Sequence, residues 1–193
     1  MKTKKIKSRY QLNYRFVTFL TFIIISSAAY AEDSSNLSWW SGIKDSLSQT
    51  WQSQDYELYI PVNTWHNRNF YPKEKIDAFN ERPWGIGVGK YRFDEEGDWH
   101  ALYVMAFEDS NNAIEPVAGY AFQKVWRPAE DVRLGAGYTL GLTMRQDINY
   151  IPIPVIAPVF SVAYKQLAVQ STYILGGNEH GNILFTWLRW QLK

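Results

Sequence analysis

The sequence predicts an all-β fold: an eight-stranded antiparallel up-and-down transmembrane β-barrel preceded by a short amphipathic α-helix. Beyond residue 55 the chain divides into about eight segments of barrel-strand length, separated by residues typical of turns. Aromatic residues make up 17 % of the chain, yet beyond residue 31 no segment is as long as an apolar membrane-spanning helix. A closed barrel is then the remaining way to cross a membrane.

The first 31 residues have the pattern of an export signal. An apolar core, Phe16–Ile25, is followed by the small-x-small cleavage site Ala29-Tyr30-Ala31. An uncleaved anchor would need about 20 apolar residues, which is more than this core offers. We therefore expect cleavage of residues 1–31, a periplasmic lead and helix over 32–55, and the barrel over 56–193. The cations that precede the core are Lys2, Lys4, Lys5, Lys7, Arg9 and Arg15.

The composition excludes several functions. Without the six cations of the signal, the formal net charge of +1 becomes −5, which argues against a nucleic-acid partner. The chain has no cysteine, so disulfides and thiolate catalysis are excluded. No group of His, Asp and Glu residues has the spacing of a metal-ligand set, and we expect no metal site.

The segment "SWWSGIKDSLSQTW" predicts a helix with one apolar face. Its apolar residues follow one another at spacings of three, four and four, and the opposite face is polar. Such a helix could pack against the barrel or lie in the membrane interface, and the sequence leaves both open. The apolar positions are Trp40, Ile43, Leu47 and Trp51.

The expected strands are joined alternately by tight turns and by longer loops. The tight turns include "DEEG" and "KQ". The longer joins are residues 67–82, 109–114, 145–154 and 176–180, which face the cell exterior if the amino terminus starts inside. The expected strands are Tyr56–His66, Pro83–Phe93, Asp98–Glu108, Glu115–Trp126, Val132–Met144, Val155–Tyr164, Leu167–Leu175 and Gly181–Gln191.

The strand faces indicate an interior that is not a water-filled pore. In "DWHALYVMAF" both alternating faces are largely apolar, so the barrel should enclose side chains or an apolar ligand. A "GxGxG" run lies within a strand and no helix follows it, which disfavours a nucleotide-binding loop. Such strand glycines indicate bends or close packing, with a cavity as the alternative. They are Gly85, Gly87, Gly89, Gly135, Gly137 and Gly141.

Three reactive side chains are expected at the outer rim. His66 ends the first strand, while Asp109 and Ser110 follow the third strand at the same end of the barrel. A base, a carboxylate and a hydroxyl at the mouth of an apolar barrel suit acyl transfer. The alternative is that His66 is an ordinary surface residue, since no nucleophile-elbow motif is present. His100 is expected near the inner turn, and His180 lies in an outer loop without an adjacent Asp-Ser pair.

Several longer motifs carry a resemblance to a known family. They are "WQSQDYELYIPVNTWHNR", "KEKIDAFNERPWG", "GDWHALYVMAFEDS", "EPVAGY", "WRP" and "NYIPIPV". Together they resemble the outer-membrane lipid A palmitoyltransferase family over nearly the whole mature chain. The resemblance implies transfer of a palmitoyl chain from a phospholipid to lipid A, without a cofactor. It also implies that His66, Asp109 and Ser110 are the catalytic residues.

The resemblance extends to the path that lipids would take. In the family, prolines interrupt strand pairing, because proline lacks the N–H that a sheet ladder needs, and so open lateral gates for lipids. Pro61, Pro83 and Pro158 match these prolines. Leu175 stands where a proline of the second gate is expected. Ala121 matches the glycine at the floor of the acyl-chain pocket, the hydrocarbon ruler of the family. Arg145 matches an outer-loop arginine that could meet lipid phosphate, or it is a solvated charge.

Function is therefore expected to be acyl transfer in the bacterial outer membrane, with the active rim facing the cell exterior. The partners are a phospholipid acyl donor and a lipid A acceptor, and we expect a monomer that aids resistance to cationic antimicrobial peptides. One alternative is a non-catalytic barrel that binds a hydrophobic ligand or acts as a surface protein. A phospholipase is another, because water can replace the acceptor hydroxyl.

Overall fold

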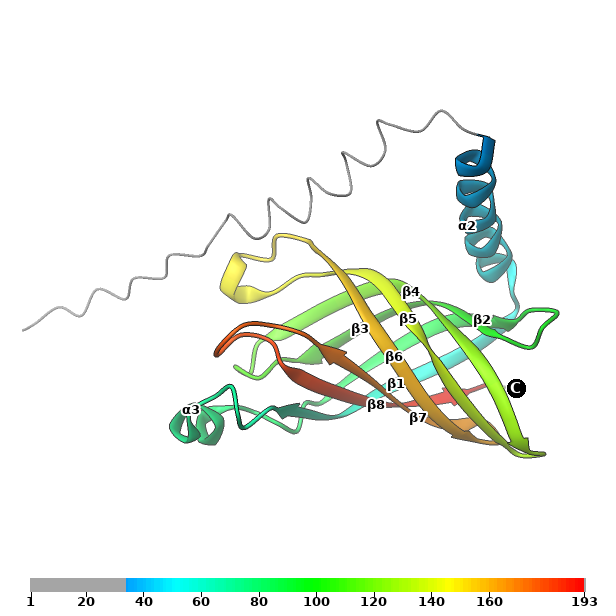
Figure 1. Cartoon of the computed structure of the whole chain (residues 1–193). Helices are drawn as coiled ribbons and strands as arrows, with labels where there is room; N and C mark the ends of the chain where they lie inside the picture. The colour runs from blue at the N-terminus through cyan, green and yellow to red at the C-terminus, as the bar shows by residue number, and fades with distance from the viewer. Residues whose placement is uncertain (1–33, 193) are drawn as a thin grey trace, which may run out of the picture. The chain divides into compact units, whose positions relative to one another are not determined.

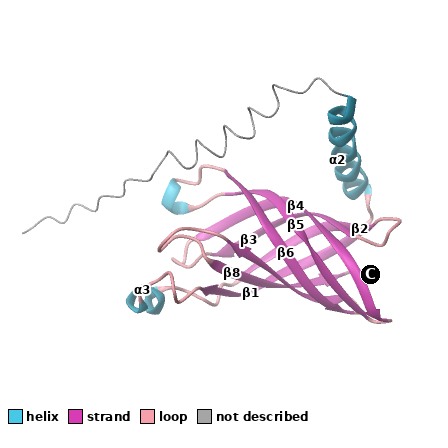
Figure 2. Cartoon of the chain, in the orientation of Figure 1, coloured by secondary structure: helices cyan, strands magenta, loops and turns pink. Residues whose placement is uncertain are grey.

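A computed structural model describes residues 34–192, with side chains from residue 41 onward. Its strands form one closed barrel in chain order, which confirms the predicted fold class (Figures 1 and 2). The barrel lies within the compact unit Lys44–Lys193. The strands are β1 (Asp55–His66), β2 (Gly85–Phe93), β3 (Trp99–Glu108), β4 (Ile114–Ala129), β5 (Val132–Thr143), β6 (Ile153–Tyr164), β7 (Leu167–Ile174) and β8 (Ile183–Gln191). The helices are α2 (Ser34–Gln52), α3 (Lys73–Ala78) and the 3₁₀ turn η2 (Gln146–Ile148).

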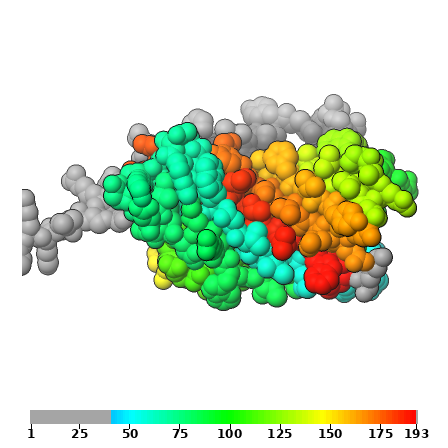
Figure 3. Space-filling model, turned by 90° about the horizontal axis from the view of Figure 1, so that it is seen from below, coloured from blue at the N-terminus to red at the C-terminus, as the bar shows by residue number. Residues whose placement is uncertain are grey.

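Every neighbouring pair of strands is antiparallel, and β1 closes the barrel against β8. The closing register runs from Glu57 opposite Gln191 to His66 opposite Ile183. Figure 3 shows β1, β8 and β7 side by side as cyan, red and orange bands across one face. In Figure 1 the segment with α3, the η2 loop and the β7–β8 connection lie at one end of the barrel. The longer connections therefore gather at one rim, as the alternation of loop lengths predicts.

The outer surface of the barrel is apolar. Along β6 burial alternates residue by residue, with Val159 inside and Phe160 and Val162 more than half exposed outside. Exposed apolar side chains on successive strands form the surface that an apolar membrane interior favours. None of the described helices is long and apolar enough to cross a membrane.

Bulky interior side chains occupy space that strand glycines leave free. A Cβ added at Gly135 would lie 2.5 Å from Ser161 Oγ and 2.8 Å from Gln123 Oε1. At Gly89 an added Cβ would lie 2.9 Å from the ring of Tyr59. At these two positions the glycines serve close packing, as expected from their place in strands.

Helix α2 is tied to β2 through the residues at its carboxyl end. Lys90 Nζ donates to the carbonyl of Trp51 at 2.8 Å, and its ammonium lies 5.4 Å from the Trp51 ring centroid. Arg92 Nε donates to Thr50 Oγ1 at 3.3 Å. Of the predicted apolar face, Leu47 is half-buried and Trp51 is largely exposed, while the side chain of Trp40 lies outside the described residues. The predicted signal sequence, residues 1–31, also lies outside them.

The strand boundaries differ from the predicted ones by a few residues. β2 begins at Gly85 rather than at Pro83, because proline has no N–H for the sheet ladder. Helix α3 was not predicted, and it forms within the loop 67–82 with a Lys73–Asp77 pair at i,i+4.

Gly135→Ala should destabilise the barrel because its methyl group would meet Ser161 and Gln123 at less than contact distance. Overpacking of this kind costs about 1–3 kcal/mol. Gly177→Ala is the control, since a Cβ there meets nothing within 4 Å. Thermal unfolding in detergent, followed by circular dichroism, should show a lower midpoint for Gly135→Ala only. Equal midpoints for the two variants would contradict the packing role of Gly135.

Candidate active site

His66 and Ser110 meet at one rim of the barrel although they lie far apart in the chain. Ser110 Oγ lies 3.0 Å from His66 Nε2, and the two residues are 44 positions apart in the chain. His66 ends β1, and Ser110 lies in the turn between β3 and β4. The topology thus brings together a potential base and a hydroxyl that no local sequence motif joins.

The imidazole of His66 is enclosed by two aromatic rings. Phe79 stacks on it with centroids 4.3 Å apart, and Tyr71 meets it edge-on at 5.3 Å. Only 1 % of His66 is exposed. Tyr71 is itself anchored, because its hydroxyl donates to the carbonyl of Gly181 at 2.6 Å. The side chain of His66 is therefore buried and fixed by its neighbours, unlike that of an ordinary surface histidine.

The carboxylate beside His66 belongs to Glu81. Its Oε1 lies 3.0 Å from His66 Nδ1 and also accepts the backbone N–H of His66 at 3.0 Å. An ionised carboxylate can only accept hydrogen bonds, so Nδ1 carries the proton and Nε2 is left as the acceptor toward Ser110. No local sequence pattern singles out Glu81, although the loop 67–82 that carries it is predicted to lie at this rim.

Arg68 binds the Glu81 carboxylate through both terminal nitrogens of its guanidinium. Arg68 Nη2 donates to Oε2 at 2.6 Å and Nη1 donates to Oε1 at 2.5 Å. These hydrogen bonds are the main reason why the pKa of Glu81 falls to about 2. Glu81 is thus an anion throughout the neutral pH range.

Asp109 lies next to Ser110 but bonds to its own turn. Its Oδ1 accepts the backbone N–H groups of Asn111 at 2.8 Å and Ala113 at 2.9 Å. The resemblance implies a catalytic Asp109, but the hydrogen bonds of this side chain go to backbone N–H groups of its turn and not to His66. Asp109 instead shapes the turn that presents the Ser110 hydroxyl.

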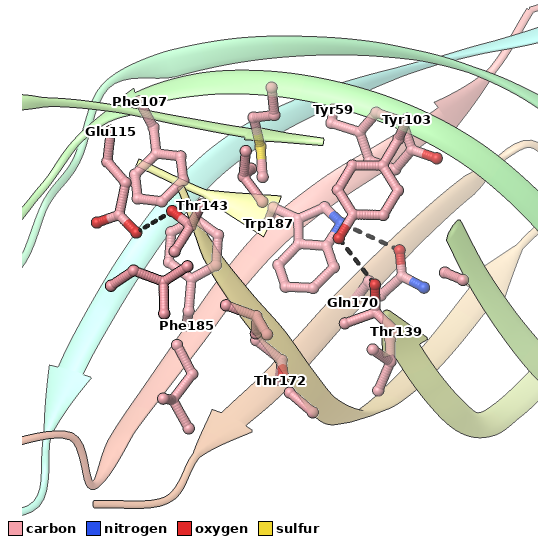
Figure 4. Close-up of a pocket in the computed structure, with 18 of the residues that line it drawn as sticks. Tyr59, Tyr103, Phe107, Glu115, Thr139, Thr143, Gln170, Thr172, Phe185 and Trp187 are labelled. Atoms are coloured by element: carbon pink, nitrogen blue, oxygen red, sulfur yellow. Dashed lines mark hydrogen bonds between the residues drawn. The ribbon is translucent and has the colours of Figure 1, made fainter. Parts of the chain in front are cut away.

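An apolar pocket of about 240 Å³ occupies the barrel interior (Figure 4). Its lining includes Trp99, Tyr103 and Phe107 of β3, which span roughly 27 Å along the strand at about 3.4 Å per residue. Polar lining groups are largely paired: Tyr103 with Thr139, Trp187 with Gln170, and Thr143 with Glu115. Apolar cavities of ~150 Å³ can stay dry and bind hydrocarbons. The pocket accordingly suits a long apolar chain.

Ala121 lies at the inner part of this pocket. It is 3 % exposed, lines the pocket and packs in a cluster with Trp99 and Tyr91. Glu57 and Arg189 form a buried ion pair, and the Arg189 guanidinium lies 4.0 Å from the Trp99 ring centroid. The pocket therefore ends on an aromatic ring that a charged side chain supports.

Two interruptions of the strand ladder lie near the predicted gate prolines. Pairing of β1 with β2 runs from Asp55 only to Tyr59, and Pro61 lies two residues further along β1. Pro83 precedes the first residue of β2. Pairing of β6 with β7 runs from Tyr164 only to Val159, and Pro158 is the next residue of β6.

The remaining candidates are dispersed. Leu175 follows the last residue of β7 and is 80 % exposed. Arg145 lines the pocket just beyond the carboxyl end of β5 and forms two hydrogen bonds with Asp147. His100 lies near the opposite end, where it bonds with Asp94. Among residues 34–192 no group of three or more His, Cys, Asp or Glu side chains could hold a metal ion.

A barrel with an apolar interior pocket and a hydrogen-bonded histidine–serine pair at its rim belongs to the class of membrane barrel enzymes that act on lipids. The comparison with known families identifies it further. Residues 46–189 match the model of the family described as antimicrobial peptide resistance and lipid A acylation protein PagP. The chain belongs to this family.

Its relatives are similar over most of their length. "Lipid A acyltransferase PagP" of Laribacter hongkongensis is 60 % identical over 153 residues, covering 79 % of this chain and 74 % of the relative. The protein of the same name from Pectobacterium carotovorum is 50 % identical, covering 88 % of this chain and 82 % of the relative. That of Proteus mirabilis is 54 % identical, covering 80 % and 74 %.

The Arg68–Glu81 pair should make stability depend on pH in acid. Because the folded-state pKa of Glu81 lies below its ordinary value of 4.5, the pair stabilises fully above pH 4.5 and is lost as pH falls toward 2. Arg68 is partly exposed, so the contribution is at most about 1 kcal/mol. Between pH 5 and 2 the unfolding midpoint of Arg68→Met should fall less than that of the native protein. Parallel curves would contradict the assignment.

Proposed function

We propose that this barrel transfers a palmitoyl or similar-length acyl chain from a phospholipid to lipid A in the outer membrane. The observation that carries the proposal is the hydrogen bond between His66 Nε2 and Ser110 Oγ at the rim of an acyl-sized apolar pocket. Membership of the lipid A acylation family supports lipid A as the acceptor. The same reaction remodels the outer leaflet and aids resistance to cationic antimicrobial peptides.

The donor is proposed to insert one acyl chain into the pocket so that its ester group reaches the rim. Phe107 lines the outer part of the pocket, and Asp109 and Ser110 follow it closely in the chain. Arg145 is proposed to meet the donor phosphate by exchanging its bonds with Asp147. The gates beside Pro61, Pro83 and Pro158 would let lipids enter sideways from the membrane. At the second gate Leu175 stands where the family has a proline, so its shape is expected to differ.

His66 is proposed as the general base. Nε2 takes the proton of a lipid A hydroxyl while that oxygen forms a bond to the ester carbonyl carbon of the donor. The tetrahedral intermediate then breaks the bond to the glycerol oxygen, which leaves as lysophospholipid after taking the proton back from His66. One ester forms and one breaks, so the step needs neither a cofactor nor an oxidant.

Ser110 and Asp109 are proposed to complete the site. In the absence of acceptor the Ser110 hydroxyl bonds with Nε2, and with acceptor present it can donate to the developing oxyanion. Asp109 fixes the turn that carries Ser110 through its bonds to two backbone N–H groups. We propose that this rim faces the cell exterior and that the protein acts as a monomer.

His66→Ala should fold but lose most acyl transfer, because general acid–base catalysis contributes about 100-fold or more. The measurement uses purified protein in detergent with a palmitoyl phospholipid and lipid A, and quantifies acylated lipid A. His180→Ala is the control and should stay near native activity. Native turnover by His66→Ala would overturn the assignment of the base, and fatty acid release without acylated lipid A would favour a phospholipase.

Ala121→Gly should lengthen the preferred acyl chain. Removal of one methyl group at the inner end of a close-packed pocket extends it by about one methylene, since protein interiors register volume changes of this size. Competition between saturated phospholipids of graded chain length would show the shift. An identical length preference in the native protein and in Ala121→Gly would remove Ala121 from the ruler.

A further inference from the structure

The segment Phe79–Glu81, just before β2, joins the two halves of the rim. Phe79 stacks on the His66 ring, and the backbone N–H of Asn80 donates to the carbonyl of Ser110 at 2.9 Å. Asn80 Nδ2 also donates to Glu108 Oε2 at the end of β3, again at 2.9 Å. Three consecutive residues thus contact both β1 and the β3–β4 turn.

Glu81 substitutes for β2 where the ladder between β1 and β2 is interrupted. Its carbonyl accepts the backbone N–H of Thr64 at 3.0 Å and Asn63 Nδ2 at 3.1 Å. Its side chain accepts the N–H of His66 at 3.0 Å. Both the backbone and the side chain of one loop residue therefore hold the end of β1 that carries the histidine.

We propose that Glu81 is a positioning residue of this enzyme: it fixes the tautomer and the ring orientation of His66, and Arg68 holds it in place for that task. The inference rests on the acyl transfer proposed above. Glu81 contacts no reacting atom and acts only through the imidazole. Its part is to keep the proton on Nδ1, to leave Nε2 free as the base, and to stabilise the imidazolium that forms when Nε2 takes a proton.

The surroundings of His66 support this assignment. The charged or titratable side chains that face its ring are Glu81, Arg68 and Tyr71. The guanidinium of Arg68 also donates to the carbonyl of His66 at 2.7 Å. Arg68 therefore contacts the backbone of His66 as well as the carboxylate that binds its ring. Among these groups only Glu81 can accept the Nδ1 proton as an anion.

Glu81→Gln tests the role of the charge at almost constant shape. In serine–histidine–aspartate enzymes the equivalent change of carboxylate to amide lowers kcat by about 10⁴ through the wrong tautomer. We expect kcat for acylation of lipid A to fall by about 100-fold or more, with KM for the phospholipid changed less than about twofold. Glu81→Asp, which keeps the charge, should recover part of kcat. Glu179→Gln is the control, since this outer-loop carboxylate pairs with Lys75 and not with His66.

Two further readouts separate positioning from a purely structural role. The acidic limb of kcat/KM against pH should move to lower pH in Glu81→Gln, because the imidazolium loses its counter-charge. In a His66→Ala background, Glu81→Gln should cause no additional loss, since it acts through the missing ring. Circular dichroism checks that each variant is folded.

The outcomes distinguish this inference from the proposed function. If His66→Ala is inactive while Glu81→Gln keeps native kcat and an unchanged pH profile, Glu81 does not position the base and only this inference fails. If Glu81→Gln loses activity equally in the native and the His66→Ala backgrounds, Glu81 acts independently of His66, which also overturns it. If His66→Ala itself is fully active, the proposed function fails first.

Discussion

The end of β1 has to find hydrogen-bond partners without β2, and the rim is built around that requirement. Buried backbone N–H groups are almost always paired, because an unpaired one costs as much as a lost hydrogen bond. Above Tyr59 the partners on the β2 side come from Glu81, which accepts from Thr64 and His66. The same residue holds the imidazole, so the interrupted ladder and the ordered histidine have one structural cause.

The interior of the barrel is arranged to keep an apolar volume open. Several of its polar side chains bond to one another: Ser161 and Gln170 each donate to Gln123, and Trp187 donates to Gln170. Burying a polar group costs free energy unless it is hydrogen-bonded, and these pairs avoid that cost. The rest of the pocket wall is apolar. Strand glycines such as Gly135 make room for this network. A pocket bounded by fixed side chains can respond to the length of a bound chain.

Much of the fold could be predicted from periodicity and loop lengths, because barrel strands alternate every second residue and their turns have characteristic residues. The strand ends His66, Phe93, Glu108 and Tyr164 coincide with the predicted ones. β4, which was expected to end at Trp126, continues to Ala129, since pairing with β5 resumes at Val132 beyond an irregularity. Helix α3 could not be predicted, because its six residues are too few to show a helical periodicity of apolar positions and none of them is buried.

Of the candidate site, topology predicted the shared rim of His66 and Ser110, but it did not predict the partner at Nδ1. Glu81 lies in "FNERPWG", where nothing local distinguishes it from Glu74 or Glu108. Its role depends on a contact across 15 residues that only the three-dimensional path of the loop creates. Asp109, adjacent to Ser110 in sequence, was the more obvious carboxylate. Its Oδ1, however, accepts hydrogen bonds from backbone N–H groups of its own turn.

The central claim is that this barrel acylates lipid A in the membrane where it resides. Mass spectrometry of lipid A, extracted from cells with and without the protein, tests that claim most directly. The account predicts a lipid A species heavier by one fatty acyl group, dominated by a single chain length, in cells that produce the protein. An unchanged lipid A spectrum, with the folded barrel present in the outer membrane, would contradict it.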